Sequence, residues 1–283
     1  MPPATVVTRF APSPTGYLHL GHAFAALFAH RLAAEAGGRF LLRIEDIDPL
    51  RCRPEFAAAI EEDLAWLGLA WERPVRVQSE HLADYRRVLE ALAARGLVYP
   101  CFCTRADIAR EIAASAEAPH QGPDGPHYPG TCRALREDER RGRIAAGAPY
   151  ALRLDMARAA AAAGPLAFRE AGEPRVATPE IFGDVVLGRK DTPASYHLCV
   201  THDDAAQGVT LVTRAEDLRP ATHLHRLLQA LLGWQVPQWR HHPLRVGPDG
   251  RRHAKRDRSV TLRDLRAAGH TPAAVRALAG LPD

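Results

Sequence analysis

The sequence predicts an α/β protein built on a doubly wound parallel sheet. Residues 39–44 are apolar apart from two arginines, as expected of a strand buried in a parallel sheet. Helical spacing of apolar residues follows in residues 54–67 and again in residues 82–95. A strand-to-helix turn precedes them in residues 6–22. This alternation of strands and helices is the pattern of a doubly wound sheet.

Length and composition set the limits of the prediction. The 283 residues are enough for one large domain or two, with a sizeable core. A formal net charge of +4 permits nucleic-acid binding but does not argue for it alone. No apolar run suggests a signal peptide or a membrane span, so we expect a cytoplasmic protein without membrane contact. Its five cysteines are then expected to be thiols or metal ligands rather than disulfides.

The first element in the chain is the turn RFAPSPTGYLHLGH, residues 9–22, between the end of a short strand at Val6 and Val7 and a helix over residues 23–36. Such a turn places backbone N–H groups and the positive end of a helix at the carboxyl edge of a sheet, where anions bind. Gly21 lets a flat group approach the backbone, and His19 and His22 share one helix face from which they can contact phosphate.

This turn resembles the His-x-Gly-His signature of class I aminoacyl-tRNA synthetases, and residues 9–16 resemble the glutamyl branch of that family. The resemblance implies that His19, Gly21 and His22 bind ATP and take part in catalysis. The alternative is that the two prolines only shape a turn and the two histidines only pack.

The strand over residues 39–44 ends in a cluster of carboxylates, Glu45, Asp46 and Asp48. Open α/β sheets bind ligands at the carboxyl ends of their strands. The string RIEDIDP resembles a second signature of the glutamyl branch, which implies that Glu45 contacts the amino group of bound glutamate. The alternative is a helix N-terminus decorated with acids. Trp66 and Trp71, near the end of the next helix, are expected to pack rather than to stack on a nucleotide.

A change of character follows residue 99. Cys101, Cys103 and Cys132 flank a loop rich in proline, glycine and histidine, and three such cysteines can converge on one ion. Tetrahedral zinc needs a fourth ligand, and on sequence alone His120, His127 and Tyr128 are all candidates, with histidine the usual choice. The spacing resembles the zinc site of the glutamyl-queuosine subgroup, which implies Tyr128 as the fourth ligand. The alternative is three buried free thiols; Cys52 and Cys199 are expected to pack.

Residues 133–143 are rich in arginine but interleaved with acids, which indicates a solvated helix, with contact to a tRNA backbone as the alternative. Residues 194–204 are expected to resume the parallel sheet, and residues 208–218 follow the family's sequence closely. The resemblance implies that Tyr196 and Arg214 contact glutamate. Arg9 offers a second guanidinium for a carboxylate, and Phe10, Ala11, Pro12 and Ser13 complete the predicted glutamate site.

The last third of the chain is expected to hold a helix over residues 224–232 and a strand over residues 242–246. A basic loop, residues 250–257, stands where the class I enzymes carry Lys-x-Ser-Lys, and Lys255 is the lysine it retains. The resemblance implies that Lys255 contacts ATP and acts in catalysis. A helical pair over residues 262–281 ends the chain.

The resemblance runs from Arg9 to about Leu281 and implies a Rossmann-like catalytic domain split by an inserted zinc-bearing domain. The predicted boundaries are 1–99 with 190–245 for the catalytic domain, 100–189 for the insertion, and 246–283 for the basic loop and a short helical C-terminal segment. Because no anticodon-binding region follows, the chain resembles the glutamyl-queuosine tRNA(Asp) synthetase subgroup. Members activate L-glutamate with ATP and Mg²⁺ and attach it to the queuosine base at the wobble position of tRNA(Asp). We expect a monomer.

Two other functions stay open from the sequence. One is a glutamyl-tRNA synthetase that charges the 3′ end of tRNA(Glu). The other is a non-catalytic RNA- or nucleotide-binding relic, suggested by the altered loop at residues 252–255.

Overall fold

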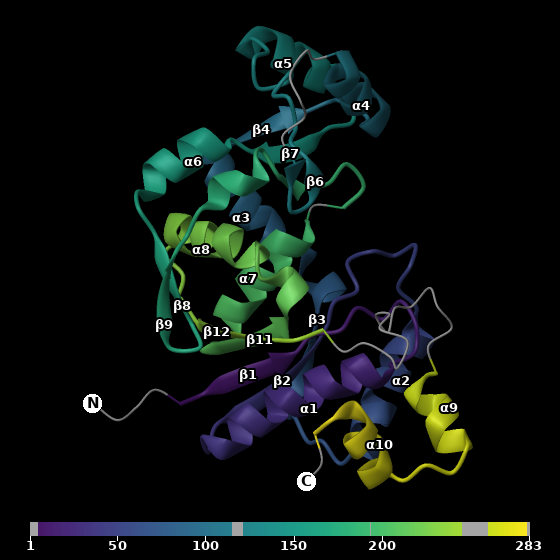
Figure 1. Cartoon of the computed structure of the whole chain (residues 1–283). Helices are drawn as coiled ribbons and strands as arrows, with labels where there is room; N and C mark the ends of the chain where they lie inside the picture. Colours follow the sequence, from purple (N-terminus) through teal and green to yellow (C-terminus); the bar gives the residue numbers. More distant parts are fainter. Residues whose placement is uncertain (1–4, 115–120, 193, 245–259, 282–283) are drawn as a thin grey trace.

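The computed structural model describes residues 5–114, 121–192, 194–244 and 260–281. A parallel sheet lies at its centre (Figure 1). The first half of this sheet has the strand order β1-β2-β3, with β1 (Val7–Phe10) parallel to β2 (Arg39–Ile44) and β2 parallel to β3 (Glu72–Val77). β1 extends through Phe10, so the predicted turn begins inside the strand rather than after it.

The second half contains β11 (Leu211–Ala215), which is parallel to β12 (Gln238–His242). Hydrogen bonds between Thr210 and Val7, at 2.8 and 3.0 Å, hold β11 beside β1. Through this contact the two groups of strands lie side by side, in the order β3-β2-β1-β11-β12. The chain leaves β1 in one direction to build β2 and β3, and in the other to build β11 and β12. This reversal is the topological switch point at which open α/β sheets bind ligands.

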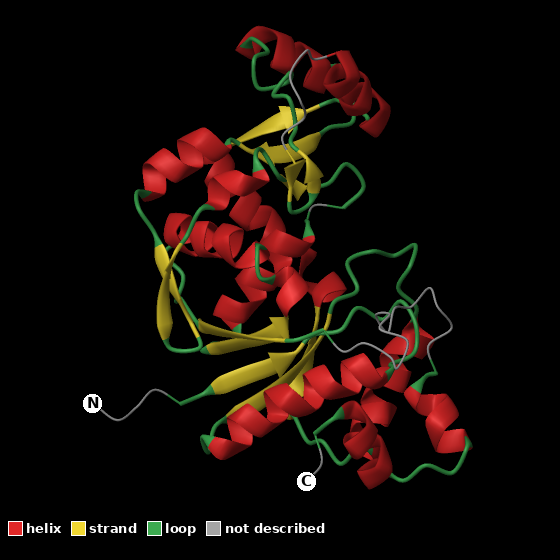
Figure 2. Ribbon diagram, in the orientation of Figure 1, coloured by secondary structure: helices red, strands yellow, loops and turns green. Residues whose placement is uncertain are grey.

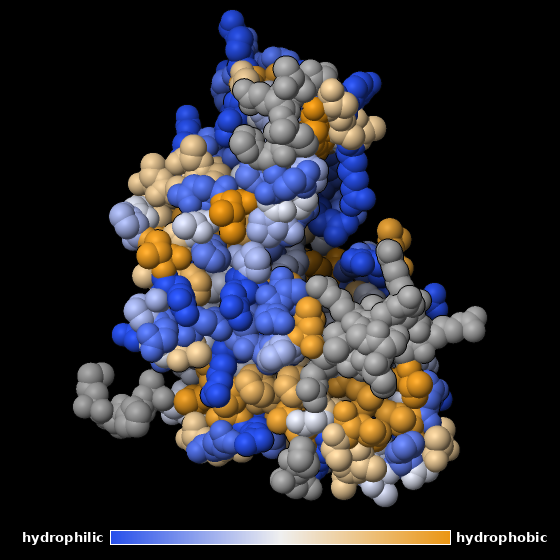
Figure 3. Space-filling view, viewed as in Figure 1, coloured by the Kyte–Doolittle hydropathy of each residue, from blue (hydrophilic) through white to orange (hydrophobic). Residues whose placement is uncertain are grey.

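Helices cover both faces of this sheet (Figures 1 and 2). On one face α1 (Leu20–Glu35) packs against β1, β2 and the C-terminal helix α10 (Pro272–Ala279). On the other lie α7 (Tyr196–Ala206) and α8 (Ala221–Leu232). Figure 3 shows apolar residues gathered over the part of the surface formed by α1 and the C-terminal helices.

Most expected elements agree with the structure. The strand over residues 39–44 and the terminal helical pair are confirmed, and four further helices agree within a few residues. The helices concerned are α1, α2 (Pro54–Trp66), α3 (Leu82–Ala94), α8, α9 (Leu262–Ala267) and α10. Trp66 and Trp71 pack against the core beside α1 and α2, as expected.

Two expectations are wrong. Residues 194–204 do not resume the sheet, because Tyr196–Ala206 is the helix α7 and the sheet resumes only at β11. The strand expected over residues 242–246 begins earlier, since β12 spans Gln238–His242 and residues 243 and 244 are not strand; residues 245 and 246 lie outside the described residues.

The segment from β4 to β10 includes the part of the molecule drawn farthest from α1, around α4 and α5 (Figure 1). A sheet of order β10-β7-β4 lies at its base, and two exposed helices lie beyond it. In its middle the segment reaches the parallel sheet, where β8 pairs with β12 and with β9, before the chain goes back to β10. The elements are β4 (Val98–Cys101), α4 (Arg105–Ala114), β5 (Gln121–Gly122), β6 (Gly125–Pro126), α5 (Glu137–Ala145), β7 (Ala151–Leu154), α6 (Met156–Ala163), β8 (Ala167–Glu170), β9 (Glu173–Val176) and β10 (Val186–Gly188).

α5 is the helix expected from the arginine-rich residues 133–143, and it has no buried residue, as predicted for a solvated helix. Among the described residues, no helix has both the length and the apolar character that crossing a membrane requires.

Candidate active site

A cavity of about 510 Å³ opens at the carboxyl ends of β1, β2 and β11, at the switch point of the sheet. Eleven of the twelve residues predicted to bind glutamate or ATP line this one cavity. They are Arg9, Phe10, Ala11, Pro12, Ser13, His19, Gly21, His22, Glu45, Tyr196 and Arg214. The twelfth, Lys255, lies outside the described residues, together with the rest of the basic loop.

His19 and His22 lie at the start of α1. His19 is the N-cap, and its Nδ1 accepts a hydrogen bond from the backbone N–H of Gly21 at 3.1 Å. The backbone N–H of His19 donates to Nδ1 of His22 at 3.3 Å, and the two ring centroids are 3.9 Å apart. This reciprocal cap holds both imidazoles at the positive end of the helix, beside the cavity.

The loop between β1 and α1 is fixed to the end of β2. The backbone N–H of Glu45 donates to Pro12 at 3.0 Å, and that of Arg53 donates to Pro14 at 3.0 Å. The backbone of residues 11–14 is therefore fixed in position, with residues 11–13 beside Glu45 on the cavity wall.

Arg9 reaches the cavity from β1 and is 5% exposed. Its Nε lies 2.9 Å from Oδ1 of Asp204, and its Nη1 donates to the carbonyl of Thr213 at 3.0 Å. Arg9 thus joins β1 to both α7 and β11, and a buried carboxylate compensates its charge.

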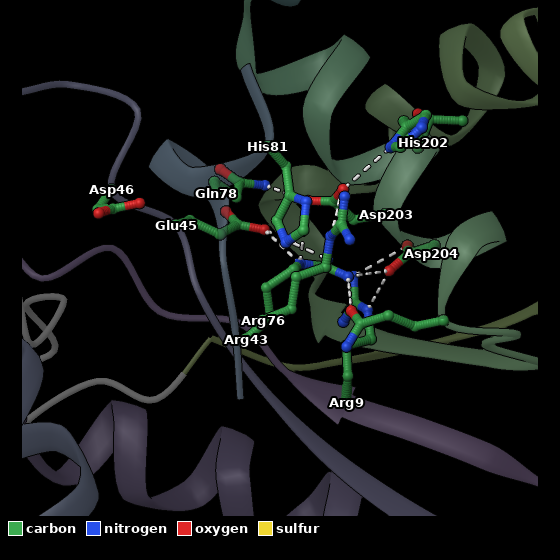
Figure 4. A network of polar contacts seen from close by, with 12 residues as sticks. Arg9, Arg43, Glu45, Asp46, Arg76, Gln78, His81, His202, Asp203 and Asp204 are labelled. Atoms are coloured by element: carbon green, nitrogen blue, oxygen red, sulfur yellow. Dashed lines mark hydrogen bonds and ion pairs between the residues drawn. The ribbon is translucent and has the colours of Figure 1, made fainter. Parts of the chain in front are cut away.

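Arg43 lies at the centre of a buried ionic network behind Arg9 (Figure 4). Its guanidinium contacts three carboxylates, at 2.9 Å from Asp204, 3.3 Å from Glu45 and 3.9 Å from Asp203. Arg43 has no exposed surface, so these charges are desolvated and depend on one another. Gln207 also accepts a hydrogen bond from it at 2.9 Å.

The network continues outward through Asp203. This carboxylate accepts hydrogen bonds from Arg76 at 2.8 Å, Gln78 at 2.9 Å and Tyr85 at 2.9 Å. Although burial raises it, the hydrogen bond from His202 and the charges of the nearby arginines bring the pKa of Asp203 down to about 2. Asp203 is therefore a fixed negative charge behind the cavity at physiological pH.

Glu45 is the buried acidic group of the cavity wall. It is 7% exposed, and burial raises its pKa, while Arg43 and then Arg9 oppose that rise. An ammonium group placed in the cavity beside Glu45 would favour its ionised form.

Arg214 enters the cavity from β11 and has different partners from Arg9. Its guanidinium donates to Thr222 at 2.7 Å, to His225 at 3.2 Å and to His241 at 3.2 Å. Within the described ranges no carboxylate lies at ion-pair distance from it. Its charge is buried, with 7% of the residue exposed, and its closest partners are uncharged.

Sequence reasoning missed most of these supporting residues. The signal for Arg43 was an arginine inside an otherwise apolar strand, and that for Asp203 and Asp204 was a pair of acids next to apolar residues. His225 and His241 carried no signal, because single histidines at these positions fit a packing role equally well. Cavity residues that sequence reasoning did not assign are Ala25, Val200, Thr213, Ala215, Asp217, Leu218, His242 and Leu244.

A second candidate site lies between β4 and α5. The sulfur atoms of Cys101, Cys103 and Cys132 lie within 4.8 Å of one another. The hydroxyl of Tyr128 is 3.3 Å from Sγ of Cys103 and accepts a hydrogen bond from the backbone N–H of Cys132 at 2.8 Å. Three thiols and one phenol therefore converge on one point, as a tetrahedral metal site requires.

The candidates for the fourth ligand differ in position. Nε2 of His127 lies 2.7 Å from the carbonyl of Ile181 and does not join the sulfur cluster, and His120 lies outside the described residues.

Burial raises the pKa of Tyr128, and burial together with neighbouring thiols raises that of Cys103 to about 11. Without a cation, these groups stay protonated at neutral pH, and a bound metal would displace their protons.

The chain is similar to known proteins over nearly its whole length. Residues 5–281 match the model of the family described as tRNA synthetases class I (E and Q), catalytic domain. A "Glutamyl-Q tRNA(Asp) synthetase" of Rhodobacter capsulatus is 51% identical, over 98% of this chain and 100% of the relative. A protein of that name from Symbiobacterium thermophilum is 45% identical, over 94% of this chain and 83% of the relative.

More distant relatives are longer. A "Glutamate--tRNA ligase" of Aquifex aeolicus is 38% identical, and the match spans 95% of this chain but 55% of the relative. A crystal structure of a glutamate tRNA ligase from Elizabethkingia meningosepticum, in complex with its amino acid, is similar with a TM-score of 0.74 and 28% identity. The match covers 94% of this chain and about half, 53%, of that one.

Proposed function

This chain belongs to the class I tRNA synthetases of the glutamate and glutamine type, and from that premise we propose that it activates L-glutamate with ATP and transfers it to the queuosine base at the wobble position of tRNA(Asp). The amino-acid part of this proposal depends on one observation, the charges of the cavity. Two buried guanidiniums, Arg9 and Arg214, and one buried carboxylate, Glu45, line it. Glutamate has two carboxylates and one ammonium, the complementary set.

In the first step, an oxygen of the glutamate α-carboxylate attacks the α-phosphorus of ATP. A bond forms between that oxygen and phosphorus, the bond to the bridging oxygen breaks, and pyrophosphate leaves with its electron pair. No side chain has to act as a nucleophile, so catalysis consists of positioning and of stabilising charge on phosphoryl oxygens.

We assign that stabilisation to the start of α1 and to the basic loop. His19 and His22 are held at the helix N-terminus and face the cavity, where phosphates are favoured. Gly21 leaves room for the adenosine. Lys255 is proposed to clamp the phosphates, on the strength of the sequence, with Mg²⁺ entering as part of the ATP substrate.

In the second step, the oxygen of a hydroxyl on the modified base attacks the carbonyl carbon of the adenylate. An ester bond forms, the bond between that carbon and the phosphate oxygen breaks, and AMP and the hydroxyl proton leave. The choice of tRNA depends on the relatives. Those at 51% and 45% identity carry the glutamyl-Q name, whereas the glutamate–tRNA ligase is 38% identical. We therefore favour queuosine over the 3′ end of tRNA(Glu). ATP and tRNA are cytoplasmic, and we place the reaction there, on a monomer.

We also propose that the sulfur cluster holds a structural zinc ion. Cys101, Cys103, Cys132 and Tyr128 supply the four donors, and their convergence supports this set. Bound zinc would tie β4 to the loop that precedes α5. The ligands lie far along the chain from the residues of the glutamate cavity, and we give the ion no part in the chemistry.

Two assays test the proposed function. Purified protein should catalyse glutamate-dependent exchange between pyrophosphate and ATP, which a non-catalytic relic cannot do. It should then glutamylate tRNA(Asp) that contains queuosine, but neither tRNA(Asp) lacking queuosine nor tRNA(Glu). If the protein glutamylated tRNA(Glu) but did not glutamylate queuosine-containing tRNA(Asp), the result would contradict the proposal and favour the alternative that it charges tRNA(Glu).

A further inference from the structure

Arg214 is held by two arms of hydrogen-bonded side chains, each of which contains histidine and ends at a carboxylate. The short arm is His241 followed by Glu170 on β8. The long arm is His225 on α8, then His197 on α7, then Asp124 in the turn between β5 and β6. We infer that these two arms position the Arg214 guanidinium for a substrate carboxylate while leaving its charge uncompensated. This inference rests on the proposed function, since it takes glutamate as the ligand of Arg214.

The short arm allows only one direction of donation. A guanidinium can only donate, so Nε2 of His241, 3.2 Å from Nε of Arg214, must accept. The proton of a neutral His241 then lies on Nδ1, which is 2.7 Å from Oε2 of Glu170. The other oxygen of Glu170 accepts from the backbone N–H of His241 at 3.0 Å, so the ring is held from two sides.

The long arm follows the same rule over more steps. Nδ1 of His225 lies 3.2 Å from Nη1 of Arg214 and must accept, which places the proton of His225 on Nε2. That proton is donated to Nδ1 of His197 at 3.1 Å. His197 then carries its proton on Nε2, which lies 2.9 Å from Oδ2 of Asp124. Every donor meets an acceptor, and all of the histidines of both arms are neutral.

Burial supports this protonation state. His225 is 2% exposed, and burial, followed by the charge of Arg214, holds its pKa well below the usual value. The same two causes lower the pKa of His241 to about 4. A proton on either accepting nitrogen would face the guanidinium and break the contact.

The consequence is a difference between the two arginines of the cavity. Arg9 lies against the carboxylate of Asp204, whereas Arg214 has hydroxyl and imidazole partners. The negative ends of both arms lie one or two side chains away from the guanidinium. Arg214 is therefore rigid but still lacks an anion, which favours a carboxylate ligand. The long arm also links the cavity to the inserted segment, through an Asp124 side chain that is 56% exposed.

Steady-state kinetics of pyrophosphate exchange test the arms. Each of the two leucine variants, His225→Leu and His241→Leu, removes one hydrogen bond that positions the charged guanidinium of Arg214. Each should therefore raise the glutamate KM on the order of tenfold to a hundredfold. The ATP KM and the maximal rate should stay near wild type. His241→Gln places an amide oxygen near the position of Nε2, keeps the acceptor, and should fall closer to wild type than His241→Leu.

His223→Leu is the matched control, because His223 lies on the same helix but contacts Thr178 at 2.9 Å and takes no part in either arm. Its glutamate KM should stay within about twofold of wild type. The inference would be overturned if the glutamate KM of His225→Leu and His241→Leu were no higher than that of this control. It would also be overturned if the ATP KM of these variants rose as much as their glutamate KM.

If the leucine variants do not fold, the exposed end of the long arm decides. Asp124→Ala should raise the glutamate KM about two- to fivefold, the effect of one exposed contact, whereas Asp124→Asn keeps an acceptor oxygen and should not. Equal KM values in these two variants would then overturn the inference. Absence of glutamate-dependent exchange in the wild-type protein is a different result, since it contradicts the proposed function itself.

Discussion

Arg43 never reaches the cavity, yet two residues of the cavity wall depend on it. Its guanidinium faces Glu45, which lines the cavity, and Asp204, which in turn holds Arg9. In the buried network of Figure 4, the three arginines Arg9, Arg43 and Arg76 face three carboxylates, Glu45, Asp203 and Asp204. Removing one cation leaves buried anions uncompensated, which costs more than the intact network contributes.

Arg43→Met should therefore reduce the free energy of unfolding by about 3–5 kcal/mol. Arg39→Met is the matched control on the same strand, because Arg39 pairs with Glu72 in an exposed contact that is worth about 0–1 kcal/mol. Chemical denaturation of both variants measures the difference. Equal losses would show that the buried network does not depend on Arg43.

Lys255 and Arg214 are expected to act at different stages of the reaction. Lys255 is proposed to meet charge that builds only as the α-phosphorus is attacked, so Lys255→Ala should lower the maximal exchange rate on the order of a hundredfold to a thousandfold. Arg214→Ala should mainly raise the glutamate KM, because Arg214 is proposed to touch the amino acid in ground and transition states alike.

Pyrophosphate exchange measured against glutamate concentration separates the two effects. A near-normal maximal rate in Lys255→Ala would remove Lys255 from the chemistry, and Arg252 or Arg256 would be tested next.

At the scale of elements, the sequence predicts those that have one buried face. α3 and α8 show apolar residues at helical spacing, and β2 is a short apolar run, so all three were found. α7 was mistaken for part of the sheet. Its residues 197–201 are all buried, including polar ones, so no face of the helix differs from the others and the period is lost. The strand β12 is expected too late in the chain for a related reason, since Trp239 is its one apolar residue and its sequence shows neither an apolar run nor an apolar alternation.

The candidate site shows the same limit. Residues within the family's contiguous motifs, such as His19 and Glu45, could be named from the sequence and lie together. The residues that hold Arg214 could not be named from the sequence. They come from α8 and β12, which lie next to Arg214 only in the folded chain. Hydrogen-bonded pairs that join distant elements leave no local pattern in a single sequence.

The metal prediction concerns the segment from β4 to α5. Cys103→Ser should remove zinc from the purified protein and lower the melting temperature, because a structural site couples metal affinity to folding. Cys52→Ser is the control, since Cys52 lies outside the sulfur cluster. Zinc content by atomic spectroscopy and a thermal melt with and without chelator measure both. Purified wild-type protein without zinc but with normal stability would contradict the site.

At the scale of the whole molecule, the switch point of the sheet joins two stretches of chain that are far apart in sequence. β1 and β2 supply Arg9 and Glu45, while α7 and β11 supply Tyr196 and Arg214. The ion pair between Arg9 and Asp204 crosses between these halves at 2.9 Å, and that between Arg43 and Asp203 at 3.9 Å. The charged walls of the cavity are therefore held together by contacts within the protein.

From this we predict that glutamate activation does not need tRNA. The cavity residues proposed to bind glutamate, Arg9, Glu45 and Arg214, already contact fixed partners within the protein. RNA binding is therefore not needed to bring them into position. Pyrophosphate exchange should proceed at its full rate in the absence of RNA, and addition of queuosine-containing tRNA(Asp) should change the rate by less than about twofold. Glutamine in place of glutamate should give no exchange at equal concentration, because a neutral amide leaves a buried guanidinium without an anion. Exchange that begins only after tRNA is added would mean that RNA binding reshapes the cavity, and that the ion pairs across the switch point do not suffice to fix it.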